Sequence, residues 1–382
     1  RAMSRREPST ILFLPLAHVL GRSVQLACLR ARVVLGHSPS VQPAQLRPDL
    51  ASFRPTFLVG VPYLYEKIHD TGYAQAADMG RAGAFRRAAA IARRYGRLAA
   101  EVDPRSSVSW LGLVGLRLAH RLYDLLVYRR IRAALGGRVR YAISGGSALS
   151  PELIHFFAGA GIAIYEGYGL TETFAAITVN PPLRPRPGTV GRPLPGAAVR
   201  SGPGGEVALR GPMVFAGYHR SAGTGPDEQG WFRTGDLGSL DPDGYLTITG
   251  RASELLVTSS GKNVSPTLLE DRLRSHPLVG QCIVVGDRRP FVAALLSLDR
   301  EAVEQWRRHA ADKSEDGLRA ALQEAVDAAN AAVSRAESIR AFAVVPGEFT
   351  EDNGLLTPSL KLRRARVLET YAAQVEQLYG RP

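Results

Sequence analysis

The stretch that decides the fold of this chain is Tyr165-Glu166-Gly167-Tyr168-Gly169-Leu170-Thr171-Glu172-Thr173. Apolar runs at residues 156–164 and 174–179 flank it, and they predict buried segments that meet at a central loop. Within that loop, Gly167 and Gly169 predict a sharp turn to which a ligand can come close, because glycine carries no Cβ.

The other side chains of the stretch suit a nucleotide. Tyr168 offers a flat ring for a nucleobase, and Thr171 and Glu172 place a hydroxyl beside a carboxylate. Such hard oxygen ligands suit Mg²⁺ and phosphate. The simpler interpretation of this stretch alone is a strand–turn–strand with a surface Thr-Glu pair, because short glycine-rich loops are common.

Four more motifs occur in the chain, in this order: Ser144-Gly145-Gly146-Ser147-Ala148-Leu149, Gly230-Trp231-Phe232-Arg233-Thr234-Gly235-Asp236, Gly250-Arg251, and Thr357-Pro358-Ser359-Leu360-Lys361. The five motifs together resemble those of the adenylate-forming superfamily (ANL-type enzymes), in particular the acyl-CoA synthetases of the long-chain fatty-acid-CoA ligase type. The resemblance runs over essentially the whole chain.

Composition narrows the function classes. The net charge is +13, and nearly all positive charge is arginine, since Lys67, Lys262, Lys313 and Lys361 are the only lysines. The arginines are scattered and do not form a stripe with interleaved aromatic residues, so no nucleic-acid partner is predicted. Phosphate-rich ligands or an anionic membrane surface agree with the charge.

The two cysteines, Cys28 and Cys282, predict neither a disulfide framework nor a metal site. No apolar run reaches the roughly 18 residues that a membrane span needs. Together these features predict a cytoplasmic protein. The chain opens on Arg1 with a strand-like run close behind, so its true start is expected upstream.

Two domains are predicted. The resemblance implies that residues 1–250 are a partial large AMP-binding domain. Apolar strand-like runs at 11–16, 31–35, 57–62 and 139–143 alternate with helical patterns, and this alternation predicts α/β sheet layers. Ser150 and Pro151 predict the start of a helix after the last of these strands. Residues 251–382 read as a small, mobile α+β lid, with strands at 282–285, 291–298 and 341–345 and helices at 266–274, 318–335 and 363–378.

Two parts of the large domain have a character of their own. Residues 181–250 are rich in Gly, Pro and short strands and predict a distorted β-barrel, with a turn at Asp241-Pro242-Asp243-Gly244. Residues 66–135 predict a helical insert that Asp103-Pro104 divides in two. The insert resembles the long-chain branch of the acyl-CoA synthetases. Its basic residues flank leucine-rich faces, which leaves open a peripheral membrane contact as well as a merely solvated hairpin.

The resemblance assigns roles to single residues. Gly145, Gly146 and Ser147, with Glu166, Gly167, Tyr168 and Gly169, would seat the adenine of ATP; Asp236 and Arg251 would hold the ribose. Thr171 and Glu172 would serve Mg²⁺ and the phosphates, and Lys361 would be the catalytic cation. Gly261 and Lys262 would meet the pantetheine arm of CoA. His18 would line the acyl pocket, although a lone histidine after a strand is as readily structural.

The implied reaction joins a fatty acid, ATP and CoA in two steps, through an acyl-adenylate, with a swing of the lid about Ser253. A serine there departs from the family, which more often has Lys or Asp. The family's phosphate loop, ending in Lys-Gly ahead of the Leu-Pro-Leu-Ala-His segment, is not found in the chain, and this predicts weak or absent adenylation by the chain alone. A non-catalytic remnant and a fatty acyl-AMP ligase that loads a carrier protein are the alternatives.

Overall fold

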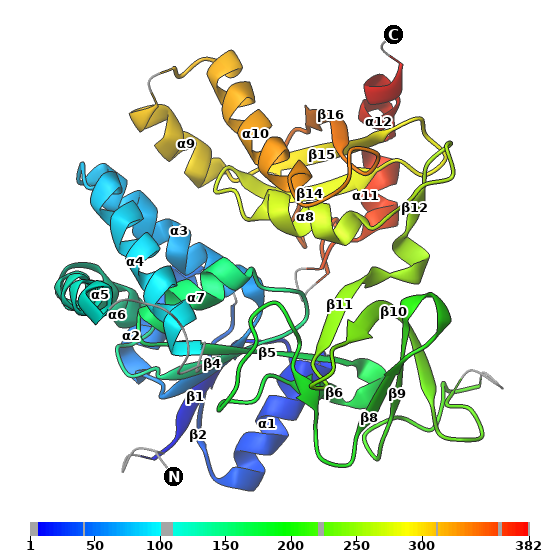
Figure 1. The fold of residues 1–382 in the computed structure, drawn as a ribbon, viewed down its shortest axis with the longest axis horizontal. Coiled ribbons are helices and arrows are strands. Elements are labelled where there is room, and N and C mark those ends of the chain that lie inside the picture. The colour runs from blue at the N-terminus through cyan, green and yellow to red at the C-terminus, as the bar shows by residue number, and fades with distance from the viewer. Residues whose placement is uncertain are drawn as a thin grey trace. The chain divides into compact units, whose positions relative to one another are not determined.

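The computed structural model describes residues 7–40, 43–100, 110–220, 225–310, 312–357 and 361–380. The chain divides into two units, drawn in Figure 1. Unit 1 comprises Arg1–Gly202, Ala208–Thr234 and Ser239–Thr247, and unit 2 comprises Pro203–Val207, Gly235–Gly238 and Ile248–Pro382. Each unit contains its own buried hydrophobic clusters.

The main sheet of unit 1 has five strands in the order β3-β4-β5-β6-β7. The first three run parallel, and the last two pair antiparallel. Their bounds are β3 Phe57–Gly60, β4 Tyr141–Ser144, β5 Ala163–Leu170, β6 Ala175–Val179 and β7 Arg192–Pro193. A separate parallel pair is formed by β1 (Ser9–Leu12) and β2 (Val34–His37). These pairings confirm the predicted α/β class with parallel strands and helical crossovers.

Helices connect and cover the strands of unit 1. They are α1 Val19–Ala31, α2 Pro43–Phe53, α3 Pro62–Asp78, α4 Ala82–Ala100, α5 Trp110–Tyr123, α6 Arg129–Ala134 and α7 Pro151–Gly159, with a π-helical segment η1 at Asp124–Tyr128 between α5 and α6. Residues 66–135, predicted to be a helical insert, are thus mostly helical where the structure describes them. The predicted break at Asp103-Pro104 lies outside the described residues.

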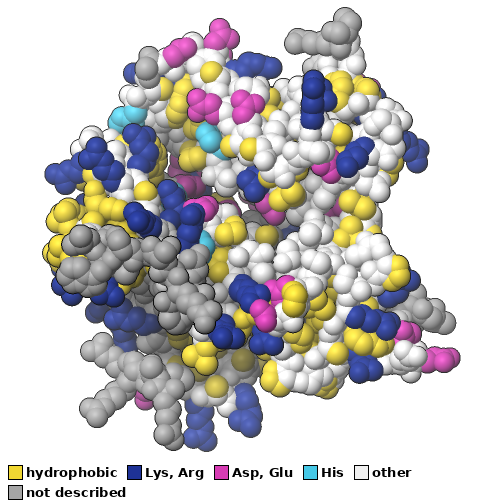
Figure 2. Space-filling view, in the orientation of Figure 1, with side chains coloured by type: hydrophobic (Ala, Val, Ile, Leu, Met, Phe, Trp, Pro, Cys, Tyr) yellow, Lys and Arg dark blue, Asp and Glu magenta, His cyan; other side chains and the backbone are white. Residues whose placement is uncertain are grey.

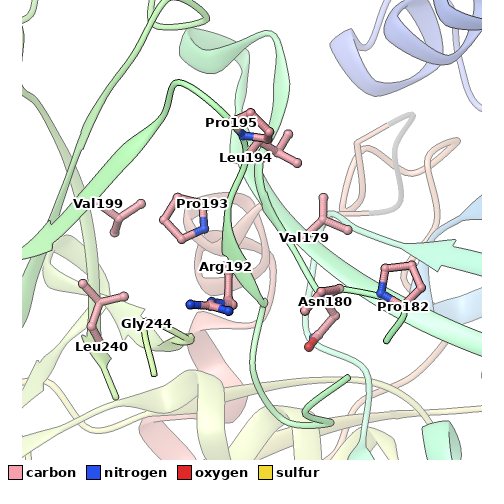
Figure 3. A pocket seen from close by; sticks show the side chains of 11 residues that line it. Val179, Asn180, Pro182, Arg192, Pro193, Leu194, Pro195, Val199, Leu240 and Gly244 are labelled. Carbon is pink, nitrogen blue, oxygen red and sulfur yellow. The ribbon is translucent and has the colours of Figure 1, made fainter. Parts of the chain in front are cut away.

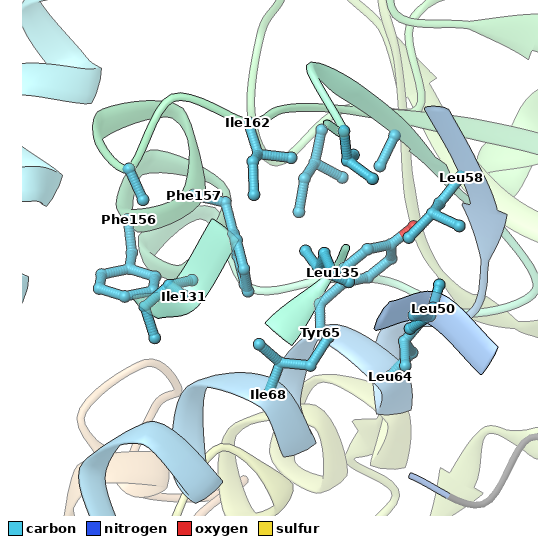
Figure 4. Packing of buried hydrophobic residues seen from close by; sticks show 14 of the residues in the cluster. Leu50, Leu58, Leu64, Tyr65, Ile68, Ile131, Leu135, Phe156, Phe157 and Ile162 are labelled. Atoms are coloured by element: carbon cyan, nitrogen blue, oxygen red, sulfur yellow. The ribbon is translucent and has the colours of Figure 1, made fainter. Parts of the chain in front are cut away.

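The core of unit 1 forms where the helices meet the sheet. Tyr65 of α3 is fully buried and lies edge-on to Phe157 of α7, as Figure 4 shows. The Tyr65 hydroxyl donates to the carbonyl oxygen of Ile143 at 3.1 Å, so that the one polar atom of this large ring is satisfied inside the core. This contact ties α3 to β4, the strand that leads to the first glycine motif.

A four-stranded sheet, β11-β10-β9-β8, follows in the chain, and three of its strands, β9, β10 and β11, each contain residues assigned to both units. It consists of β8 Ala198–Ser201, β9 Glu206–Arg210, β10 Phe232–Leu240 and β11 Leu246–Arg251. The predicted turn between β10 and β11 is confirmed: the Gly244 amide donates to the Asp241 carbonyl at 2.9 Å, and Gly244 adopts a φ of 81°. This sheet corresponds to the predicted barrel-like part.

Unit 2 has a three-stranded sheet in the order β14-β15-β16, made of Val279–Val285, Val292–Leu298 and Ile339–Val344. Its helices are α8 Pro266–Arg274, α9 Arg300–His309, α10 Glu315–Asn330, α11 Arg364–Thr370 and α12 Ala372–Tyr379, and a short hairpin joins β12 (Leu256–Val257) to β13 (Asn263–Val264). The predicted α+β character is confirmed. Helix α9 was not predicted, although Asp299 caps it by accepting from the Ala302 amide.

Two strand predictions near the N-terminus are displaced. The first strand ends at Leu12 rather than at residue 16, since Pro15 cannot continue a ladder. The expected strand at 31–35 begins only at Val34, because α1 continues to Ala31 and Arg32 closes it in a left-handed conformation with a φ of 54°. No helix within the described residues is long and apolar enough to cross a bilayer.

Candidate nucleotide site

The central motif lies in a strand, which corrects the predicted loop. Residues 163–170 form β5, and neither Gly167 nor Gly169 has a positive φ. Their lack of a side chain serves strand pairing instead. A Cβ on Gly169 would lie 1.6 Å from the carbonyl oxygen of Ala175 in β6, where the register shifts between Tyr168 and Gly169. Glycine is therefore required for the close approach of two strands at an irregular point.

The turn after β5 is held by Thr173. Its buried hydroxyl accepts from the Leu170 amide and donates to the Ala175 carbonyl, both at 2.8 Å. The short 3₁₀ helix Thr171–Thr173 then leads into β6 through Phe174 and Ala175, which both have positive φ. This compact turn is the part of the motif that does reverse the chain.

The Thr171-Glu172 pair lies at the surface of this turn, as predicted. Thr171 is exposed and Glu172 is partly buried. Tyr218 donates its hydroxyl to the Glu172 carboxylate, and the Phe215 amide donates to the Glu172 carbonyl at 2.8 Å. The 215–218 segment was not foreseen as a partner of the motif, because nothing in its sequence points to a residue 46 positions away.

The first glycine motif lies beside the central one. Ser144 of β4 is in register with Glu166 of β5, and Glu166 accepts from the Leu149 amide at 3.0 Å. A Cβ on Gly145 would come within 3.6 Å of the Gly167 carbonyl oxygen. Gly146 turns the chain with a φ of 95°, just ahead of Ser147. The predicted adenine-binding residues of both motifs thus come together at the ends of two adjacent parallel strands, where ligands of open α/β sheets bind.

Glu166 has a structural task that the sequence did not reveal. Its side chain is only 4% exposed, and its carboxylate links β5 to the 145–149 turn. Helix α7 begins directly after this turn, with Ser150 accepting from the Leu153 amide and Pro151 at the first helical position, as predicted. Glu166 therefore shapes this turn, and its predicted place beside the nucleotide stays a prediction.

His18 caps a helix. Its Nδ1 accepts from the Leu20 amide at 3.2 Å, at the N-terminus of α1. The structural alternative for this histidine is thereby accounted for, since a capping side chain satisfies an amide that the helix leaves without a partner. A role beside an acyl chain stays a prediction.

Unit 2 carries a second group of predicted residues. Asp236 lies in the strand β10 rather than in a loop, and it is only 4% exposed. Its carboxylate accepts from the Arg251 guanidinium at 2.7 Å. Arg251 ends β11, the neighbouring strand, so the sheet itself brings these two residues together from 15 positions apart.

Lys361 belongs electrostatically to the same group. Lys361 is an exposed residue, yet the surrounding protein removes part of the water from its ammonium group and thereby lowers the pKa of that group. The Arg251 charge lowers that pKa further, and the Asp236 carboxylate raises it. The Thr357-Lys361 loop is closed by reciprocal bonds: the Lys361 amide donates to the Thr357 hydroxyl, and the Thr357 amide to the Lys361 carbonyl. Residues 358–360 of this motif lie outside the described residues.

The remaining predicted residues of unit 2 lie in the segment between β11 and α8. Ser253 occupies a single 3₁₀ turn, Ala252–Glu254. Gly261 turns the β12–β13 hairpin with a φ of 79°. Lys262 forms an ion pair with Glu337 at 3.6 Å. The structure thus sorts the predicted site residues into two groups, one in each unit.

A cavity of about 570 Å³ lies elsewhere in unit 1, beside β7 (Figure 3). Its lining is mostly proline and aliphatic, with Arg192 as its charged side chain, and it includes none of the predicted site residues. Within the described part of the chain, no cluster of three or more His, Cys, Asp or Glu side chains is placed to hold a metal ion.

The fold and the two groups of predicted site residues define a two-part α/β protein of the adenylate-forming type. Comparison with known families agrees with this class. A family model described as "AMP-binding enzyme" matches residues 2–219, and one described as "AMP-binding enzyme C-terminal domain" matches residues 253–382. The chain belongs to the AMP-binding enzyme family.

Among curated proteins, the chain is 44% identical to the long-chain-fatty-acid–CoA ligase FadD15 of Mycobacterium tuberculosis, over 99% of the chain and 63% of the relative. It is 30% identical to the peroxisomal long chain acyl-CoA synthetase 6 of Arabidopsis thaliana, over 97% of the chain and 54% of the relative. The chain therefore spans less than two thirds of the length of these relatives.

Among solved structures, the adenylation domain of a carboxylate reductase from Mycobacterium chelonae matches 97% of the chain and 54% of that structure. The TM-score is 0.73 at 24% identity. The adenylation domain of a carboxylic acid reductase from Segniliparus rugosus, solved with AMP and a co-purified carboxylic acid, gives the same TM-score at 22% identity. These likenesses support the adenylating fold.

Proposed function

We propose that the protein activates a fatty acid with ATP and passes the acyl group to CoA, by way of an acyl-adenylate. The observation that carries the proposal is the grouping of Asp236, Arg251 and Lys361 in unit 2. These three come from three separate motifs, and they supply a buried carboxylate and two cations to one small region. The 44% identity to a long-chain-fatty-acid–CoA ligase supports the substrate class.

In the first step, a carboxylate oxygen of the fatty acid attacks the α-phosphorus of ATP, the bond to the β-phosphate breaks, and pyrophosphate leaves. Two anions must meet, so charge compensation is the main catalytic demand. We assign this compensation to Lys361, whose flexible ammonium can bridge the carboxylate and the α-phosphate. Partial desolvation lowers the pKa of Lys361, and charges that lose part of their water interact more strongly.

Asp236 and Arg251 would fix the ribose. A carboxylate only accepts hydrogen bonds, so it can receive two vicinal hydroxyl donors, and the Arg251 guanidinium holds it in place from one side. Gly145, Gly146, Ser147 and the 166–169 segment would seat the adenine against the Tyr168 ring. The absence of Cβ atoms on the glycines leaves their backbone open to the ligand.

Thr171 and Glu172 fit a Mg²⁺ ion that arrives with ATP. Mg²⁺ in such sites takes one or two carboxylates together with substrate phosphates, and this turn offers one carboxylate and one hydroxyl at the surface. When bound, the ion would screen phosphate charge. The chain's own contribution is to hold the Glu172 carboxylate, through the Tyr218 hydroxyl, in one orientation.

In the second step, the CoA thiol attacks the acyl carbonyl, the acyl–phosphate bond breaks, AMP leaves, and the thiol proton passes to solvent. We propose that residues 1–250 act as the large domain and residues 251–382 as a lid that rotates about Ser253. That rotation would exchange Lys361 for Gly261 and Lys262 near the reacting carbonyl. A rotation of this kind is a hinge motion.

The decisive experiment separates the two half-reactions with the variant Lys361→Ala in protein that carries these 382 residues. We expect fatty-acid-dependent ATP–pyrophosphate exchange to fall by about 100-fold or more, as for loss of one transition-state charge contact. Thioester formation from supplied acyl-AMP and CoA should persist. Lys313→Ala, at an exposed lysine of the same unit, is the matched control and should keep both activities. Equal loss of both half-reactions in Lys361→Ala would refute the assigned role.

The same assay decides between acceptors. A product formed with CoA supports the proposal, and a product formed only with a carrier-protein thiol identifies a fatty acyl-AMP ligase. Protein that binds ATP but shows no exchange under any condition would be a non-catalytic relative.

We further propose a cytoplasmic location, with contact to a membrane through the helical insert.

A further inference from the structure

We propose that an exposed stripe on the insert of unit 1 binds the surface of an anionic lipid bilayer. The stripe consists of four leucines and four arginines on one side of the rod formed by α5, η1 and α6. We call it the Arg–Leu stripe, and its members are Arg117, Leu118, Arg121, Leu122, Leu125, Leu126, Arg129 and Arg130. This inference does not depend on the ligase reaction.

The exposure of the leucines is the first observation. Leu118, Leu122, Leu125 and Leu126 are 61%, 55%, 64% and 55% exposed. Single exposed leucines are ordinary, but a contiguous row of them marks an interaction site. In Figure 2, yellow side chains gather over this region at the left edge of the molecule, with dark-blue basic side chains around them.

The spacing of the stripe is the second observation. Its members occur in neighbouring pairs that recur every four residues. In a regular α-helix each such step would turn the pair about 40° away from the previous one, or about 120° over the whole stripe. The π-helical turn at Asp124–Tyr128 takes in an extra residue and turns the face back by about 100°. The irregular turn therefore keeps all four pairs on one side of the rod.

The opposite side of the rod is firmly packed. Tyr128 and Ile131 are buried, and the Tyr128 hydroxyl donates to the Ala88 carbonyl of α4 at 2.7 Å. His120 stacks on Tyr95 and donates to the Gly159 carbonyl of α7 at 2.6 Å. These contacts fix which side faces outward, so the exposure of the leucines is a consequence of the fold and not of a loosely held helix.

Charge selects the occupant. Among the described residues, no carboxylate forms an ion pair with Arg117, Arg121, Arg129 or Arg130. The nearby Asp124 is taken by Arg132, which donates to it at 2.6 and 3.0 Å, and Arg129 only lowers the pKa of Asp124 from a distance. A second copy of the chain would bring like-charged stripes together and is disfavoured. Lipid phosphates complement the arginines, and the leucines reach the acyl region.

Vesicle flotation tests the proposal with protein that carries these 382 residues. Vesicles of phosphatidylcholine alone are compared with vesicles of phosphatidylcholine and an equal part of phosphatidylglycerol. We expect binding to the anionic vesicles that weakens with salt. In Arg129→Gln/Arg130→Gln, the partition coefficient should fall by roughly fivefold for each charge removed. Leu122→Ser/Leu126→Ser should weaken binding even at low salt, because it removes the apolar contact.

The chain offers matched controls. Leu183→Ser replaces a leucine that is 91% exposed, and Arg288→Gln/Arg300→Gln removes two exposed arginines of unit 2. Both should bind vesicles as the unaltered protein does. Failure of the unaltered protein to bind anionic vesicles, or equal binding by the stripe variants and the controls, would overturn the proposal. A dimer in lipid-free buffer that the leucine variant converts to monomer would also overturn it.

ATP–pyrophosphate exchange with a water-soluble fatty acid keeps this result separate from the proposed reaction. The stripe variants should retain the exchange activity of the unaltered protein, because the stripe includes no residue of the candidate nucleotide site. A protein that binds vesicles but lacks exchange would support the stripe and refute the ligase. A protein that shows exchange but does not bind vesicles would support the ligase and refute the stripe.

Discussion

Lys361 and its neighbours can be tested as an electrostatic group at the scale of single residues. Desolvation and the Arg251 charge both favour the neutral amine, so the pKa of Lys361 lies below that of an ordinary lysine, while Asp236 opposes the shift. The ammonium should therefore deprotonate earlier as pH rises, and kcat/KM for adenylation should decline at the pH where it does.

The measurement is a pH titration by NMR of protein whose lysines carry ¹³C-labelled methyl groups. Only four lysines contribute signals, and Lys361→Arg identifies the one that belongs to residue 361. We expect Arg251→Gln to raise this pKa and Asp236→Asn to lower it further. A Lys361 titration that neither substitution moves would show that the three residues do not form one group.

The pair of Asp236 and Arg251 should also stabilise unit 2. The carboxylate is almost fully buried, whereas half of the Arg251 side chain is exposed, so solvent weakens the interaction. We expect Arg251→Gln to lower the free energy of unfolding by about 1–2 kcal/mol. Combination with Asp236→Asn should cost less than the sum of the two single changes, measured by urea denaturation in a double-mutant cycle. Strict additivity would mean that the pair contributes no coupling.

At the scale of elements, the strand position of the central motif yields the next prediction. Gly169→Ala should destabilise unit 1 by roughly 3 kcal/mol, because the new Cβ would overlap the Ala175 carbonyl and push β6 away from β5. Gly115→Ala is the matched control: it lies in α5 with nothing within 4 Å, and it should be neutral or stabilise by about 0.5 kcal/mol. Thermal unfolding of both variants measures the difference, and similar values would contradict the proposed close approach.

The same element shows where the sequence was informative and where it was not. Helix starts such as Ser150-Pro151, and the turn at 241–244, follow from local capping and turn chemistry, and the structure has both. Residues 166–169 were expected to form a loop and instead form part of a strand. The prediction was wrong because glycine has two uses in proteins. It permits positive φ, and it also permits another backbone to come close. A single sequence does not distinguish these uses, since the second depends on Ala175 lying opposite.

Contacts between residues far apart in the chain could not be predicted from the sequence either. Tyr218 on Glu172 and the Glu166 carboxylate on the Leu149 amide arise from tertiary packing and leave no periodic signal in the sequence. The π-helical turn at 124–128 was also unforeseen, because leucine and valine there fit an α-helix as well. By contrast, the family resemblance predicted a shared role for Asp236 and Arg251, and the structure has these two residues in contact. Their role at a ribose stays a prediction.

At the scale of the whole molecule, the predicted residues are divided between two units, and the proposed reaction needs both groups on one nucleotide. The pivot that we propose, Ser253, can be tested with two proline substitutions one residue apart. Ser253→Pro fixes the φ angle of the pivot itself. Ala252→Pro makes the same chemical change at the first position of the 3₁₀ turn, where the preceding Arg251 already has the extended conformation that a proline demands, with φ −118° and ψ 138°.

Ser253→Pro should slow one of the two half-reactions at least tenfold and leave the other nearly unchanged, because a molecule held near one arrangement still performs the step which that arrangement serves. Ala252→Pro should keep both half-reactions, since the pivot angles stay free, and its Tm should match that of the unaltered protein. Pyrophosphate exchange and thioester formation from acyl-AMP, measured on the same preparations, give the comparison. If Ala252→Pro alone shows the selective loss, the pivot lies one residue earlier, and if both variants keep both steps, rotation at this turn is not part of catalysis.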